Sequence, residues 1–229
     1  MGDSIIMKIR LFFQALIKFL FGALIVGLLI FLSAGTIEFW NGWLFIGLLF
    51  IPMFIAGIIM FFKSPALLRR RLNAKEESEE QKQVILYSGL MFILGFVLAG
   101  LNYRFEWIIL PNAIIIIASI IFLVSYILYG EVLRENEFLS RTIEVQENQR
   151  VVDTGLYGIV RHPMYAITIL LFLSMPLVLG SIISFLIFLI YPALIIKRIK
   201  NEEKFLEKNL QGYTEYKQKV KYRLIPFVW

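Results

Sequence analysis

The chain has 229 residues, of which 59% are apolar and 17% charged, and its mean hydropathy is +0.77. Soluble domains average about 45–50% apolar and about 25% charged residues, so this composition excludes both a soluble globular protein and a disordered one. There is no cysteine, which excludes disulfides and thiolate nucleophiles. The chain has only one histidine, His162, which excludes multi-histidine metal sites, and we expect no metal. The formal net charge of +6 is informative only when it is divided by position.

Six apolar runs follow one another along the chain, and a helix that crosses a membrane needs about 20 such residues. The first four runs are long enough or nearly so: Leu11–Leu32, Gly42–Phe62, Val84–Leu101 and Ile108–Tyr129. The last two, Tyr165–Leu179 and Ile182–Ile196, are short and adjacent, which predicts a helical hairpin that crosses with tilt or fails to cross fully. The predicted fold is an all-α, polytopic membrane bundle of about six apolar helices, with five full spans as the alternative.

Basic residues lie almost entirely on one side of this predicted bundle. Only Arg104, between the third and fourth runs, falls on the other side, so 22 of the 23 basic residues share one side. Short loops rich in Lys and Arg stay cytoplasmic, which predicts an integral multi-pass protein, expected in a prokaryotic cell membrane, with both termini in the cytoplasm. The triplet at residues 69–71 is then expected to anchor the chain at anionic headgroups rather than to bind nucleic acid.

No repeat, low-complexity tract or flexible linker divides the chain. We therefore expect a single membrane domain over residues 1–229, with four helices in residues 1–130 and the more polar part in 131–229. The charged stretch Lys75–Lys82 is typical of a solvated helix or loop.

The informative polar residues lie in the last hundred positions. Residues 153–158 have the composition of a turn, and Arg161-His162-Pro163 follows them directly before the fifth apolar run. Proline is favoured in the first turn of a helix. Two interpretations are open: an interfacial helix start with snorkelling side chains, or a helix N-terminus that forms one wall of a ligand site.

A polar helix is predicted after the hairpin. Arg198 and Glu202 are four residues apart and share a helix face, as an exposed ion pair or as part of a site. An apolar stripe from Leu206 through Tyr213 and Tyr216 continues this segment and lies either on the membrane surface or over a cytoplasmic pocket.

Together these features resemble a known family. Gly155-Leu-Tyr157-Gly-Ile-Val-Arg161-His162-Pro163-Met-Tyr165, the hairpin, Arg198-x-x-x-Glu202-Glu203 and Tyr213-x-x-Tyr216 are similar to the isoprenylcysteine carboxyl methyltransferase family, which is related to the phospholipid methyltransferases. The resemblance covers roughly Gln146 to the C-terminus. It implies a membrane methyltransferase that binds S-adenosyl-L-methionine without a Rossmann fold, in a pocket between the loop before the hairpin and the helix after it.

The resemblance also implies individual roles. Arg198 would hold the substrate as the catalytic, positioning residue. Gln149 departs from the family, in which many relatives carry histidine at this position. The implied cofactor contacts are Gln146, Gln149, Arg150, Val151, Val152, Tyr157, His162, Pro163, Met164, Tyr165 and Glu202.

The nature of the methyl acceptor follows from proton chemistry. A carboxylate is already ionised at pH 7, whereas an amine or a thiol must lose a proton to a base. We therefore expect carboxyl methylation of a lipophilic, isoprenylcysteine-like substrate that enters from the bilayer; a phospholipid amine or a small thiol is the alternative acceptor. A small transporter or an assembly subunit is the non-enzymatic alternative, although transporters place ionisable residues at membrane depth and the runs at 42–62 and 108–129 contain none. The sequence leaves the oligomeric state open.

Overall fold

The computed structural model describes residues 2–73, 79–140 and 142–229, and within these ranges all regular structure is helical and no strand occurs. Residues 75–78, half of the predicted stretch Lys75–Lys82, lie outside the described residues. The longer elements are α1 (Gly2–Ala34), α2 (Trp40–Lys63), α4 (Glu79–Phe105), α5 (Asn112–Glu135), α6 (Pro163–Val178) and α8 (Ile190–Asn209). The shorter ones are α3 (Pro65–Leu72), the 3₁₀ turn η1 (Gly155–Gly158), α7 (Ile182–Phe188) and α9 (Tyr213–Lys219).

Five helical segments of the described chain are long and apolar enough to cross a membrane. The sixth apolar helix, α6, has only 16 residues, and it pairs with the longer α7–α8 segment through the turn at Gly180. The predicted all-α, polytopic membrane bundle is therefore confirmed, and the number of full spans is the five that the sequence analysis gave as the alternative. The chain is an integral multi-pass membrane protein. The spanning segments are Ile6–Ala34, Trp40–Lys63, Gln81–Phe105, Asn112–Glu135 and Ile182–Asn209.

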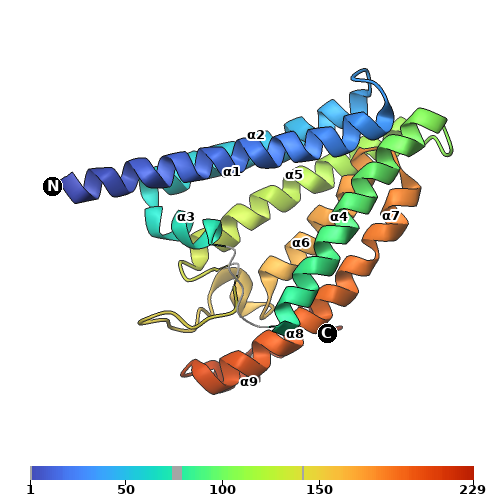
Figure 1. Cartoon of the computed structure of the whole chain (residues 1–229). Coiled ribbons are helices and arrows are strands. Elements are labelled where there is room, and N and C mark those ends of the chain that lie inside the picture. Colours follow the sequence, from blue (N-terminus) through green and yellow to red (C-terminus); the bar gives the residue numbers. More distant parts are fainter. Residues whose placement is uncertain (1, 74–78, 141) are drawn as a thin grey trace.

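The helices converge at one end of the molecule and spread apart toward the other (Figure 1). The short turns 35–39, 106–111 and 179–181 lie at the convergent end, where Asn102 donates to the Ile108 carbonyl oxygen at 2.9 Å. Between the diverging ends lie α3 and the irregular segment that leads to η1 (Figure 1). This arrangement leaves room at the broad end for a site built from loops and helix ends.

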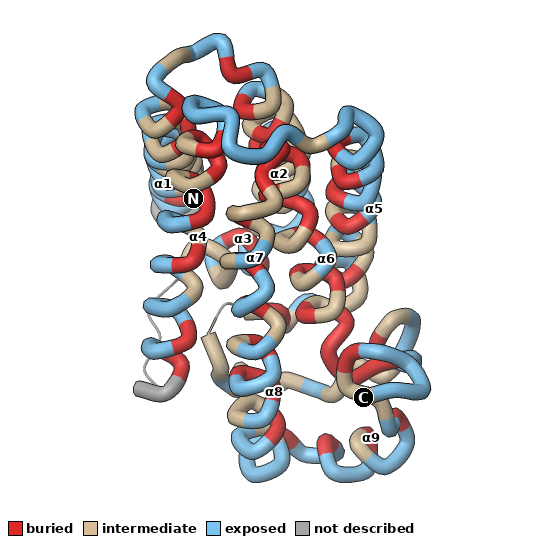
Figure 2. Tube along the Cα trace, turned by 90° about the vertical axis from the view of Figure 1, so that its right-hand side faces the viewer, coloured by how far each residue is buried: buried red, intermediate tan, exposed pale blue. Residues whose placement is uncertain are grey.

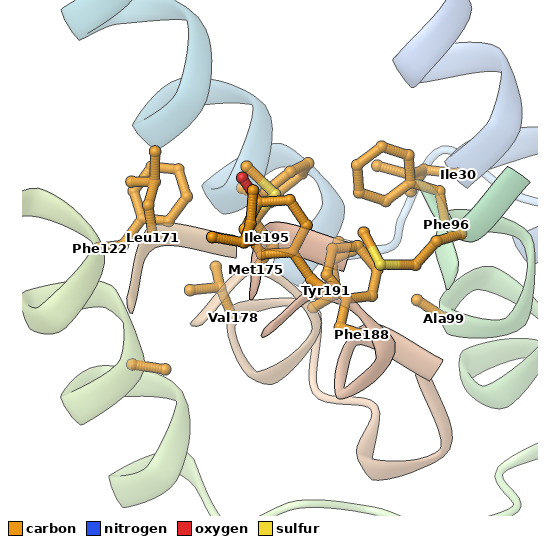
Figure 3. Packing of buried hydrophobic residues seen from close by; sticks show 14 of the residues in the cluster. Ile30, Phe96, Ala99, Phe122, Leu171, Met175, Val178, Phe188, Tyr191 and Ile195 are labelled. Carbon is orange, nitrogen blue, oxygen red and sulfur yellow. The ribbon is translucent and has the colours of Figure 1, made fainter. Parts of the chain in front are cut away.

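The core lies where α1, α2, α4, α5, α6, α7 and α8 meet, and it is rich in aromatic rings (Figure 3). Phe45, Phe122 and Phe188 are fully buried within it. Close helix packing requires small residues. A Cβ added at Gly95 would lie 2.2 Å from the Phe188 ring, and one at Gly100 would lie 2.5 Å from the Ile30 carbonyl oxygen of α1.

Outward-facing apolar side chains cover the rest of the helices. Buried positions follow the inner faces, and exposed positions follow the outer faces (Figure 2). On α1 the exposed residues include Phe13, Ile17 and Leu24, each at least 54% exposed. Water penalises apolar surface of this extent, whereas a bilayer does not. This exposure agrees with the membrane assignment.

Two local features differ from the sequence predictions. Helix α5 begins at Asn112, not at Ile108, because Pro111 disfavours helical geometry for the residue that precedes it. The basic triplet at 69–71 lies in a short helix, α3, which was not predicted. Arg70 donates to the Gln146 side chain at 2.7 Å and to the Glu137 carbonyl oxygen at 2.8 Å, so this arginine fastens the irregular segment instead of only facing headgroups.

Candidate functional site

A cleft opens at the broad end of the bundle, between the irregular residues 136–140 and 142–152, η1, the start of α6, the last half of α8 and α9. Ten of the twelve residues predicted for the site line this cleft. They are Gln149, Arg150, Val151, Val152, Tyr157, His162, Met164, Tyr165, Arg198 and Glu202.

The remaining two predicted residues do not line the cleft. Gln146 donates to the Phe138 carbonyl oxygen at 2.7 Å and accepts from Arg70, so its side-chain amide is already used to fix the segment. Pro163 is buried as the first residue of α6, where it starts the helix. Gln146 and Pro163 therefore support the segments that form the cleft and do not face its interior.

Tyr157 is placed by the turn η1. Gly155 has a φ of +50°, and a Cβ added there would lie 1.6 Å from a carboxylate oxygen of Glu135. The same carboxylate accepts from the Leu156 N–H at 3.0 Å, and the Tyr157 hydroxyl accepts from the Asn136 side chain at 3.1 Å. The end of α5 therefore holds the turn, and the turn presents Tyr157 to the cleft.

Backbone bonds tie the start of α6 to the C-terminal segment. The N–H groups of Arg161 and His162 donate to the carbonyl oxygens of Tyr222 and Arg223, each at 2.9 Å. Within the helix, the N–H of Tyr165 donates to the His162 carbonyl oxygen at 3.1 Å. The chain itself thus occupies several of the N–H groups that the sequence suggested for a ligand.

Glu203 forms a buried ionic cluster beside the cleft. Its carboxylate accepts from Arg161 at 2.7 Å, from Arg223 at 2.8 Å and lies 3.2 Å from the His162 imidazole. The Glu203 side chain is only 3% exposed. Arg161 also donates to the Val220 carbonyl oxygen at 2.7 Å, so the cluster joins α8, the start of α6 and the C-terminal segment.

A row of hydrogen bonds crosses the floor of the cleft. Tyr165 donates its hydroxyl to Glu202 at 2.5 Å and accepts from Arg198 Nε at 2.8 Å. Arg198 Nη1 donates to the side-chain oxygen Oε1 of Gln81 at 3.2 Å, which brings the start of α4 into the row. The predicted pair Arg198 and Glu202 is therefore joined through the Tyr165 hydroxyl. Gln81 was not predicted, and its position among charged residues gave no signal for it.

Helix α9 and the turn before it cover the cleft. Leu210, Tyr213, Tyr216 and Val220 form a buried cluster that packs against Val145, Val151 and Leu206. The apolar stripe therefore caps the cleft, which decides between the two placements that the sequence left open. The Tyr216 hydroxyl donates to the Tyr157 carbonyl oxygen at 2.7 Å and ties the cap to η1.

Burial raises the pKa of the hydroxyls of Tyr157, Tyr213 and Tyr216 well above the ordinary value. These tyrosines are therefore neutral at physiological pH and do not act as bases. The buried Tyr213 oxygen has no hydrogen-bond partner among the described residues. A buried hydroxyl without a partner is unusual, and one that lines a cleft fits a polar group of a ligand.

Comparison with known proteins shows a family similarity over a segment that contains the central part of this site. Residues 113–208, from α5 through most of α8, match the model of the isoprenylcysteine carboxyl methyltransferase family. Over this segment the chain is similar to the isoprenylcysteine carboxyl methyltransferase family. The resemblance seen in the sequence is confirmed, and this family implies a methyl donor.

Two further similarities concern individual proteins. A Delta(14)-sterol reductase of Mus musculus is 31% identical over 91 residues, which is 38% of this chain and 22% of the reductase. The chain thus spans about a fifth of the length of this curated relative. A solved structure of the eukaryotic intramembrane Ras methyltransferase ICMT is 16% identical, with a TM-score of 0.47 and coverage of 99% of this chain and 94% of that one.

Proposed function

We propose that the chain is a membrane methyltransferase that takes its methyl group from S-adenosyl-L-methionine and transfers it to the carboxylate of a lipophilic, isoprenylcysteine-like substrate. The observation that carries this proposal is the position of Arg198. This arginine lines the same cleft as the family motif residues and is joined to Glu202 through the Tyr165 hydroxyl.

The residues of the cleft fit the proposed methyl donor. S-Adenosylmethionine is a sulfonium cation that carries an amino acid and an adenosine and supplies an electrophilic methyl group. Glu202 can accept from an ammonium or from ribose hydroxyls, and Tyr213 offers a buried hydroxyl that lacks a partner in the described chain. The rings of Tyr157 and Tyr213 offer faces for adenine or for the positive sulfur.

The substrate side of the cleft fits a carboxylate. Arg198 presents a guanidinium, whose planar fork matches a carboxylate. Its Nε bond to Tyr165 and its Nη1 bond to Gln81 fix the orientation of this group. Holding two reactants in line is the main contribution that a protein can make to a displacement reaction.

The state of the candidate bases supports a carboxylate over an amine or a thiol. His162 and Glu202 are the implied contacts of the methyl donor, and the other carboxylate of the described lining, Glu144, lies exposed at the rim of the cleft. The buried tyrosines hold their protons. A carboxylate acceptor needs no base, whereas the other two acceptors do.

The location of the cleft suits a substrate dissolved in the bilayer. Arg198 lies on the spanning segment Ile182–Asn209, while the cap is formed by the segment that follows. We infer that the donor enters from the aqueous side and the substrate from the lipid side, with both termini in the cytoplasm according to the positive-inside rule. We also infer that residues 1–229 act as one domain, since α4 of the first half supplies Gln81 to the row in the second.

A second candidate function comes from the sterol reductase similarity. A sterol reductase reduces a lipophilic substrate, which needs a hydride donor in place of a methyl donor. The two functions differ in the donor that the cleft binds, so donor binding separates them.

Calorimetry with S-adenosylmethionine on the detergent-purified protein tests the proposal. We expect saturable binding that is weakened at least about tenfold by Glu202→Ala, since a charge-assisted hydrogen bond is worth about 1.5–3 kcal/mol. Glu207→Ala, on the exposed face of the same helix, is the matched control and leaves binding unchanged. Absent binding, binding that ignores Glu202→Ala, or binding of reduced nicotinamide in its place contradicts the proposal.

A further inference from the structure

Gln81 is a buried polar residue whose amide nitrogen has no role in the proposed mechanism. It lies in the first turns of α4 and is only 1% exposed. Its buried neighbours along the same face of α4, Val84 and Met91, are apolar. A glutamine in such a stripe is costly unless both ends of its amide are used.

The orientation of the Gln81 amide is fixed by chemistry. Arg198 Nη1 lies 3.2 Å from the Gln81 side chain, and a guanidinium only donates hydrogen bonds. The amide oxygen must therefore face Arg198, and the NH₂ group must face away from it. This nitrogen is buried and has no hydrogen-bond partner among the described residues.

The unused NH₂ group lies beside a cation that lines the cleft. Gln81 Nε2 offers two N–H donors, and the Arg198 guanidinium adds positive charge next to them. Neighbouring neutral and cationic donors are suited to an anion with two oxygens, whereas an amine or ammonium group would be repelled. The row from Gln81 through Arg198 and Tyr165 to Glu202 thus has donors at one end and a carboxylate at the other.

We propose that the Gln81 amide, together with Arg198, binds the carboxylate of the lipophilic substrate and selects it over amine acceptors. This inference rests on the proposed function. Because the amide is sealed in the packing between α4 and α8, the substrate reaches it by displacing part of that packing. A lipid-phase substrate therefore reaches Gln81 between the two membrane helices α4 and α8. Gln81 and Glu202 lie at opposite ends of the row that contains Arg198.

Substitution of Gln81 by Glu and by Leu separates ligand binding from a structural role. Glutamate keeps an oxygen for Arg198 but removes the NH₂ donors and adds a negative charge. If Gln81 only held Arg198 in place, Gln81→Glu would match the wild type and exceed Gln81→Leu. If Gln81 binds the carboxylate, Gln81→Glu is the worse of the two, because its charge repels the substrate.

Equilibrium binding of S-farnesylcysteine carboxylate is measured in mixed micelles for the wild type and each variant. We expect the Kd to rise several-fold in Gln81→Leu and at least about tenfold in Gln81→Glu, while the Kd for S-adenosylmethionine stays unchanged. Gln83→Glu is the matched control, since Gln83 is exposed on the same helix and accepts from Lys197 at 3.3 Å. This control adds the same charge two residues away and leaves the Kd near the wild-type value.

The outcomes separate this inference from the proposed function. Binding in Gln81→Glu that equals or exceeds that in Gln81→Leu overturns the inference, and so does a wild type that fails to bind the carboxylate. Normal carboxylate binding in the wild type without methyl transfer counts against the proposed function and leaves the role of Gln81 standing. Thermal unfolding of each variant identifies a loss of binding that comes from misfolding, and a second variant, Gln81→Met, then replaces Gln81→Leu as the donor-free reference.

Discussion

Removal of the Glu203 carboxylate tests how the cleft is held together. Glu203 is the shared acceptor of Arg161 and Arg223 and is 3% exposed, while the Arg161 side chain is 4% exposed. Glu203→Ala leaves a buried guanidinium without its counter-ion, which costs about 3–5 kcal/mol. That loss corresponds to a roughly 100- to 4,000-fold shift in the unfolding equilibrium. Glu203→Gln keeps one acceptor oxygen, and its loss is smaller.

The assay is reversible unfolding in mixed micelles, followed by circular dichroism, with limited proteolysis of residues 220–229 in the native state. We expect Glu203→Ala to lose stability and to expose this segment to the protease, because the cluster joins it to α6. Glu207→Ala is the control: Glu207 pairs with Lys217 at the surface and contributes at most about 1 kcal/mol. Equal stability of the two variants, with the C-terminal segment protected in both, refutes this reasoning.

Three further predictions concern single positions. Arg198→Ala is expected to keep the affinity for S-adenosylmethionine within about twofold and to abolish turnover. Arg198→Lys is expected to restore only part of the turnover, because an ammonium lacks the planar fork. A large loss of donor affinity in calorimetry would contradict the role of Arg198 in holding the substrate. Tyr213→Phe is expected to weaken donor binding by about 2- to 10-fold without loss of stability, since the buried Tyr213 hydroxyl has no partner among the described residues. A loss of stability with unchanged donor binding would show that this hydroxyl has a structural role instead. Gly155→Ala is expected to destabilise the protein by about 1–3 kcal/mol in unfolding experiments. Gly155 has a positive φ, and an added Cβ would collide with the Glu135 carboxylate. Gly130→Ala, with open space around it on α5, is its control and is neutral or stabilising.

The apolar helices were predictable because the bilayer imposes a simple rule. A membrane span must be long and apolar and must satisfy its own backbone, so composition alone marks it. The hairpin was equally visible, since Gly180 and Ser181 separate two apolar runs and Ser181 caps α7 by accepting from the Ser184 N–H. The start of α5 was misplaced because Ile108 is apolar, although Pro111 carried the correct signal.

The site was predictable only where local motifs carry it. His162, Tyr165, Arg198 and Glu202 belong to two short motifs that fold into one cleft, and these motifs were readable in the sequence. Gln81 lies 117 residues from Arg198, and its burial depends on how α4 packs against α8. Gln146 is the opposite case, because it was predicted as a cofactor contact from the family resemblance and does not line the cleft. In this chain its amide pairs with Arg70, which is 76 residues away.

Transfer of a labelled methyl group tests the central claim most directly. Purified protein is incubated with methyl-labelled S-adenosylmethionine and either S-farnesylcysteine, its carboxamide or phosphatidylethanolamine. We predict label only in the free carboxylate, as a base-labile methyl ester, and loss of this label in Arg198→Ala. Label in phosphatidylethanolamine, equal label in the carboxamide, or no label in any lipophilic acceptor contradicts the assignment as a carboxyl methyltransferase.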